Sequence, residues 1–85
     1  MARALVMLQT RTPASETPSV LARFRHAREV ARAGGVNYWA FSDDADPVSW
    51  IEFFEGPDAQ HIRATLKALD ATPQEPTIFS ELELA

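Results

Sequence analysis

The sequence predicts an α+β fold with the element order βαββαβ. Three observations support it: short β-rich apolar runs, two segments with apolar residues at helical spacing, and Gly- or Pro-containing breaks between them. The chain has 85 residues, of which 46% are hydrophobic and 24% charged, so we expect one globular domain over residues 1–85. This split β-α-β order normally gives a four-stranded antiparallel sheet with both helices on one face.

The first half of the chain predicts a strand followed by a helix. Residues 3–9 form a short apolar run that ends at a polar stretch containing Pro13, which is typical of a buried strand and a loop. Thr17 and Pro18 are expected to start a helix over residues 18–33, and Gly34-Gly35 is expected to end it. The apolar residues that share one side of this helix are Val20, Phe24, Ala27 and Ala31.

The second half predicts a hairpin, a helix and a last strand. Residues 36–42 and 48–55 are β-rich runs joined by an acidic turn over residues 43–47. Gly56-Pro57-Asp58 indicates the start of a second helix that ends near Asp70. A loop with two prolines follows over residues 72–76, and residues 77–84 alternate as a final strand. The apolar stripe of the second helix is Ala59, Ile62, Leu66 and Leu69.

Both faces of the predicted hairpin are apolar. If Ser42 lies opposite Val48, one face carries Val36, Tyr38, Ala40, Trp50, Glu52 and Phe54. The other face then carries Asn37, Trp39, Phe41, Ile51 and Phe53. Soluble monomers rarely leave such a patch in water, so we expect the second face to form a homodimer interface. A slip of one residue would exchange the faces of one strand, so the sequence leaves open which face meets the helices.

Composition disfavours several classes of partner and site. Eight Lys and Arg against twelve Asp and Glu give a net charge of −4, so we expect neither a nucleic acid nor an anionic membrane as partner. The chain has no cysteine, which leaves His26 and His61 as nitrogen ligands, and we expect no metal. The acidic turn lacks the glycine and the bidentate acid of an EF-hand loop. We expect a cytoplasmic protein, since no apolar run is long enough to span a bilayer.

Glu52 and His61 are the candidate catalytic residues. A carboxylate in the middle of an apolar strand is costly unless it is paired, protonated or facing a wet cavity. For Glu52, a hydrogen bond to Tyr38 or an ion pair with a helix arginine is as good an explanation as a functional role. His61 could act as a general acid or base, or it could be a half-exposed histidine satisfied by water or by Glu55.

A recognisable series of residues covers residues 34–69. It consists of Gly34-Gly35, Tyr38, Asp46-Pro47, Glu52, Phe54, Ala59 and His61. This series resembles the antibiotic biosynthesis monooxygenase-like family of dimeric α/β-barrel proteins, which have a ferredoxin-like fold. The resemblance implies a pocket between sheet and helices, lined by Tyr38, Glu52, Phe54 and His61. Trp50 is a further candidate for binding substrate there. The other sheet face would close the dimer barrel.

The resemblance implies one of two functions. The first is a cofactor-independent monooxygenase, in which Glu52 or His61 removes a phenolic proton from a flat apolar substrate such as a quinol. The second is a non-catalytic dimer that binds a small apolar molecule or only provides a stable subunit. A pocket filled by Trp50 and Phe54 would favour the second. The haem-degrading members of the family resemble this chain poorly, since Phe54 replaces their strand tryptophan, so we expect no haem and no other cofactor.

Overall fold

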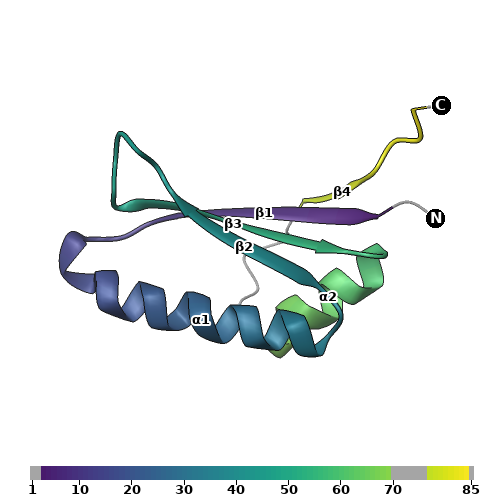
Figure 1. Cartoon of the computed structure of the whole chain (residues 1–85), viewed down its shortest axis with the longest axis horizontal. Coiled ribbons are helices and arrows are strands. Elements are labelled where there is room, and N and C mark those ends of the chain that lie inside the picture. Colours follow the sequence, from purple (N-terminus) through teal and green to yellow (C-terminus); the bar gives the residue numbers. More distant parts are fainter. Residues whose placement is uncertain (1–2, 70–76, 85) are drawn as a thin grey trace.

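The computed structural model describes residues 3–69 and 77–84. Its sheet has four antiparallel strands in the order β2-β3-β1-β4, and both helices lie on one side of it (Figure 1). The predicted α+β architecture is therefore confirmed. The strands are β1 (Ala4–Arg11), β2 (Asn37–Ser42), β3 (Ser49–Gly56) and β4 (Ile78–Ser80). The helices are α1 (Thr17–Ala33) and α2 (Ala59–Ala68), and a short 3-10 turn (Ala14–Glu16) precedes α1.

The helix ends follow from local hydrogen bonding. Glu16 occupies the N-cap position of α1, where Thr17 was predicted. The reason is that the 3-10 turn, which ends at Glu16, leads directly into the helix. Gly34 N donates to the carbonyl oxygens of Val30 and Ala31, and Gly35 has a φ of 74° that redirects the chain into β2. At α2, Asp58 Oδ1 accepts from the His61 N–H at 2.9 Å. The predicted end of this helix at Asp70 and the loop over residues 72–76 lie outside the described residues.

The hairpin has the predicted faces but a different register. Ser42 lies opposite Trp50, not Val48, so β2 and β3 are displaced by two residues from the predicted pairing. Because side chains alternate with a period of two, this displacement leaves every residue on its predicted face. The face that carries Trp50, Glu52 and Phe54 packs on the helices, where all three are buried.

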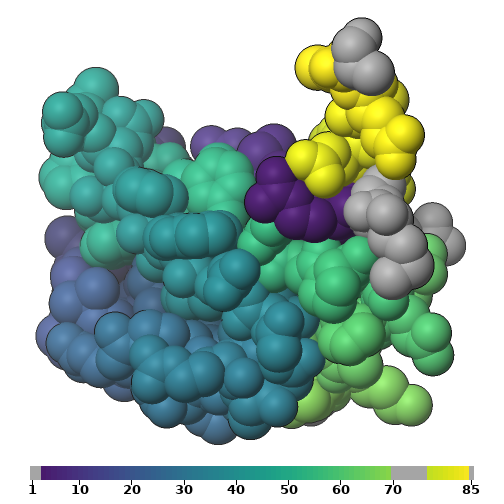
Figure 2. Space-filling model, turned by 45° about the vertical axis from the view of Figure 1, so that its right-hand side comes forward, coloured from purple at the N-terminus to yellow at the C-terminus, as the bar shows by residue number. Residues whose placement is uncertain are grey.

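The outer strands differ in length from the prediction. β1 continues to Arg11, because β3 offers it a partner as far as Ser49. β4 ends at Ser80 instead of Leu84, and its last backbone contact with the start of the chain is the bond from Glu81 N to Arg3 O at 2.8 Å. The residues that follow extend away from the helices, on the open side of the sheet (Figures 1 and 2).

The core lies between the sheet and the helices in two clusters. The larger joins β1, β3 and both helices, and the smaller lies under the other end of α1. The predicted stripes of both helices face them: Val20, Phe24, Ala27 and Ala31 of α1 and Ile62 and Leu66 of α2 are buried. Neither helix in the described part of the chain combines the length and the apolarity that crossing a bilayer requires.

Candidate functional site

Tyr38 and Glu52 form a hydrogen-bonded pair on the face of the sheet that packs on the helices. They lie on neighbouring strands, two positions apart in register, since Tyr38 is opposite Phe54 and Glu52 is opposite Ala40. The Tyr38 hydroxyl donates to Glu52 Oε2 at 2.7 Å. Glu52 is only 8% exposed, so its carboxylate is held in place and largely removed from water.

The surroundings shift the pKa of both members of this pair. Burial raises the pKa of Glu52 above its ordinary value of 4.5, and the Tyr38 hydrogen bond and the charge of Arg23 only partly oppose that rise. Burial also raises the pKa of Tyr38, and the bond to Glu52 adds to the effect. The pKa of Glu52 therefore lies above that of an exposed glutamate, so its carboxylate takes up a proton more readily. A general base requires this property.

The predicted substrate-binding aromatics pack around this pair. Phe54 is 1% exposed and meets the Tyr38 ring edge-on, with 4.9 Å between the ring centroids. Trp50 packs edge-on against Phe24 at 5.8 Å, and its indole N–H donates to Thr12 Oγ1 at 3.1 Å. The structure therefore brings Tyr38, Trp50 and Phe54 to the same face as Glu52, with Trp50 and Phe54 as members of the hydrophobic core.

His61 lies apart from Glu52, in the first turn of α2. Its side chain is 46% exposed, and its Nδ1 lies 2.8 Å from Asp58 Oδ1. Hydrogen bonds from His61 lower the pKa of the Asp58 carboxyl. His61 Cβ lies beside Gly56, four residues from Glu52 along β3, or roughly 13 Å of strand. The partner of His61 is therefore Asp58, not the predicted Glu55, and the structure does not join His61 to the Tyr38–Glu52 pair.

The open face of the sheet carries all five residues predicted for the dimer interface. These are Asn37, Trp39, Phe41, Ile51 and Phe53, which alternate with the buried residues of β2 and β3. Trp39 is 48% and Phe41 54% exposed, and the rings of Phe41 and Phe53 meet edge-on at 5.7 Å. Met7 of β1 and Phe79 of β4 are also exposed. These two residues were not predicted, although the alternation along both strands could have placed them on this face.

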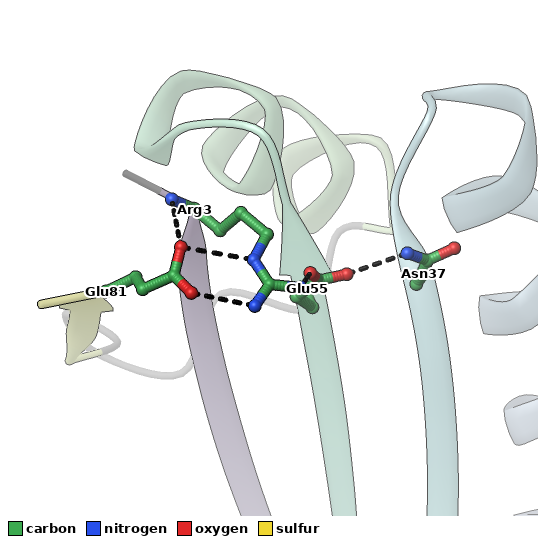
Figure 3. Close-up of polar contacts among 4 residues, drawn as sticks. All are labelled: Arg3, Asn37, Glu55 and Glu81. Carbon is green, nitrogen blue, oxygen red and sulfur yellow. Dashed lines mark hydrogen bonds and ion pairs between the residues drawn. The ribbon is translucent and has the colours of Figure 1, made fainter. Parts of the chain in front are cut away.

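A polar network crosses one end of the open face and joins all four strands (Figure 3). Arg3 contacts Glu81 at 2.8 Å and Glu55 at 3.0 Å, and the Asn37 side chain donates to Glu55 at 2.7 Å. Arg3 lowers the pKa of the Glu81 carboxyl. The network borders a groove of about 360 Å³ whose apolar floor includes Leu5, Trp39 and Phe53. No sequence motif indicated it, since Arg3 and Glu81 lie at opposite ends of the chain.

The acidic turn between β2 and β3 is held by its own hydrogen bonds. Asp43 Oδ1 accepts from the Ala45 N–H at 2.8 Å, and Asp46 pairs with Arg11 at 2.9 Å. Within residues 3–69 and 77–84, no group of three or more His, Asp or Glu side chains is arranged to hold a metal ion. The hydrogen bond of Asp43 and the ion pair of Asp46 close the hairpin and join its turn to the end of β1.

Comparison with known proteins gives structural matches. No protein-family model matches the chain, and no curated protein matches its sequence significantly. A Nitrosomonas europaea protein assigned as an antibiotic biosynthesis monooxygenase superimposes with a TM-score of 0.77 at 12% identity, over 94% of this chain and 90% of the other. The crystal structure of another antibiotic biosynthesis monooxygenase gives 0.60 at 22% identity, over 100% of both chains. The chain therefore has the ferredoxin-like fold of antibiotic biosynthesis monooxygenases, as the resemblance in its sequence predicts.

Proposed function

We propose that the chain is a homodimer that binds a flat aromatic substrate and oxidises it with dioxygen, with Glu52 as the general base. The observation that carries this proposal is the Tyr38–Glu52 pair, a buried carboxylate of raised pKa fixed by a 2.7 Å hydrogen bond. The fold shared with antibiotic biosynthesis monooxygenases supports the reaction class. A fold alone does not determine a function, so the proposal depends on the site.

The chemistry needs a base and an electron-rich substrate. Glu52 accepts the phenolic proton, and the resulting phenolate passes electrons to dioxygen without a flavin or a metal. At an activated ring methylene, CH2 and O2 become C=O and H2O. Glu52 returns the proton it accepted, so the carboxylate is regenerated at the end of the turnover. The raised pKa of Glu52 favours this step, because it makes the carboxylate a stronger base than an exposed glutamate.

The open sheet face supports the dimer. Its apolar centre, which includes Trp39, Phe41 and Phe53, lies between a polar network at one end and the Arg11–Asp46 ion pair at the other. An apolar centre with a polar rim is the usual anatomy of a protein interface. The end of the chain over residues 81–84 leaves the body on this same side (Figure 2), and its exposed Leu82 and Leu84 would add apolar surface to the interface.

A non-catalytic dimer is the second candidate function. The observation that favours it is the packing of Trp50 and Phe54, which fill space in the core next to Glu52. In this alternative, the Tyr38–Glu52 bond only satisfies a buried carboxylate. The two candidates differ in whether any substrate reaches Glu52.

Oxygen consumption with an anthrone as substrate tests the proposal. Glu52→Gln should lower the rate about 100-fold or more, because the amide cannot accept the proton. Tyr38→Phe removes a bond that lowers the pKa of Glu52, so the pH profile should move to higher pH. His61→Ala is the matched control and should leave the rate unchanged. A loss of rate in His61→Ala alone would move the role of base to His61, and no oxygen consumption by the native protein would favour the non-catalytic dimer.

A further inference from the structure

A second groove lies on the side of the molecule where α1 runs beside β2. Its volume is about 340 Å³, which is within the range of small-molecule sites. β2 is an edge strand of the sheet, so within residues 3–69 and 77–84 no further strand lies outside it. Figure 2 shows β2 in teal above α1 in blue along this side of the molecule. The residues that line the groove include Arg28, Arg32, Tyr38 and Trp39.

The wall that α1 contributes is positively charged. Arg28 and Arg32 are four residues apart and therefore lie on the same side of the helix. They share one acidic neighbour, since Glu29 Oε1 is 3.6 Å from Arg28 Nε and 3.7 Å from Arg32 Nη1. These distances exceed the 2.7–2.9 Å of a strong charge-assisted hydrogen bond. Each guanidinium has five N–H donors, so both keep donors for an additional anion.

The opposite wall is aromatic and leads to the candidate catalytic pair. Tyr38 lines the groove with its neighbour Trp39, and the Tyr38 hydroxyl bonds to Glu52. The positive charges of Arg23 and Arg28 partly oppose the rise in the pKa of Tyr38. The groove therefore combines cationic donors with an aromatic residue, Tyr38, that is hydrogen-bonded to Glu52. Its positive charge contrasts with the net charge of −4 of the whole chain.

We propose that this groove binds an aromatic ligand that carries an anionic group, with Arg28 and Arg32 holding the anion and Tyr38 contacting the ring. The inference deepens the proposed function, on which it rests for the role of Glu52, by naming the substrate class as an anionic aromatic compound. The arginines would hold the charged end of the substrate and orient the ring beside Tyr38.

Two fluorescent probes with the same aromatic body test the groove. One is 1-anilinonaphthalene-8-sulfonate, and the other is N-phenyl-1-naphthylamine, which lacks the sulfonate. The native protein should bind the sulfonate more tightly, and Arg28→Gln should weaken that binding about tenfold while leaving the neutral probe unaffected. Arg28→Lys keeps the charge and should retain most of the affinity. If the sulfonate binds equally well to Arg28→Gln and to the native protein, its site lies elsewhere, for example on the open sheet face, and the proposal is wrong.

Arg63→Gln is the matched control, since Arg63 is an exposed arginine of α2 that does not line the groove. It removes the same charge and should leave both affinities unchanged. Equal effects of Arg28→Gln and Arg63→Gln, equal losses for the two probes, or no binding of the sulfonate would overturn the proposal. Probe binding needs no oxygen chemistry, so its result does not depend on whether the protein consumes oxygen. The proposed function can thus fail in the oxygen assay while the groove passes this test.

Discussion

The carboxyl group of Glu52 should make the stability of the protein depend on pH. Its pKa in the folded state is raised above the ordinary 4.5, mainly by burial. A raised folded-state pKa contributes stability that is fully present below about pH 4.5 and is lost as the pH rises through the folded-state pKa. Glu52→Gln stays neutral and still accepts a hydrogen bond from Tyr38, so it should unfold at higher denaturant concentration than the native protein at pH 8. We expect a gain on the order of 1 kcal/mol.

Urea unfolding at pH 4 and pH 8 measures this effect. The native protein and Glu52→Gln should differ at pH 8 and converge at pH 4. Tyr38→Phe is the informative control, because it removes the donor and leaves the buried carboxyl in place. It should therefore cost more stability at pH 8 than at pH 4. A constant difference between Glu52→Gln and the native protein at both pH values would contradict the assigned pKa direction.

Single residues show which parts of the candidate site a sequence can reveal. Glu52 was predicted because a charge within an apolar strand must be satisfied, and Tyr38 was one of the partners considered. The partner of His61 was not predicted. Asp58 was expected only to mark the start of the helix, but its carboxylate also accepts from the imidazole of His61. The contacts of Arg3 with Glu55 and Glu81 depend on tertiary pairing across 52 and 78 residues of sequence, which no local pattern records.

At the scale of elements, periodicity predicted the faces but not the register of the hairpin. Any shift by an even number of residues preserves the alternation, so β2 and β3 could pair with Ser42 opposite Val48 or opposite Trp50. The turn selects the second pairing: Ser49 N donates to Asp46 O, and Asp43 N donates to Ser49 O. Helix existence was easier to predict, because the buried stripe and the flanking Gly and Pro residues agree.

The connection from α1 to β2 depends on one backbone conformation. Gly35 has a φ of 74°, which side chains with a Cβ rarely adopt. No atom would meet a Cβ at Gly35 within 4 Å, so a substitution there should act through the backbone alone. Gly35→Ala should cost about 1 kcal/mol in the free energy of unfolding. Gly35→Asn should cost less, since asparagine tolerates this region. Urea unfolding of the two variants measures the difference, and equal losses would contradict the explanation.

At the scale of the whole molecule, the sheet has two apolar faces and only one layer of helices. One face packs on α1 and α2 (Figure 1). On the other face, Met7, Trp39, Phe41 and Phe79 are exposed. The alternation of the two hairpin strands predicted this arrangement before the register was known, because any even shift leaves both faces apolar. An exposed sheet face that carries several large apolar side chains is typical of an interface between subunits.

The dimer can be tested with one substitution on each side of the molecule. Phe41→Asp places a charge in the centre of the open face. Because burying an unpaired carboxylate is costly, the Kd of a dimer formed there should rise at least about 100-fold. Leu21→Asp is the matched control: Leu21 is also exposed, at 38%, but lies on α1. Sedimentation equilibrium should find Leu21→Asp dimeric like the native protein and Phe41→Asp monomeric. A native protein that sediments as a monomer would refute the proposed dimer, whereas a dimer unaffected by Phe41→Asp would place the interface elsewhere.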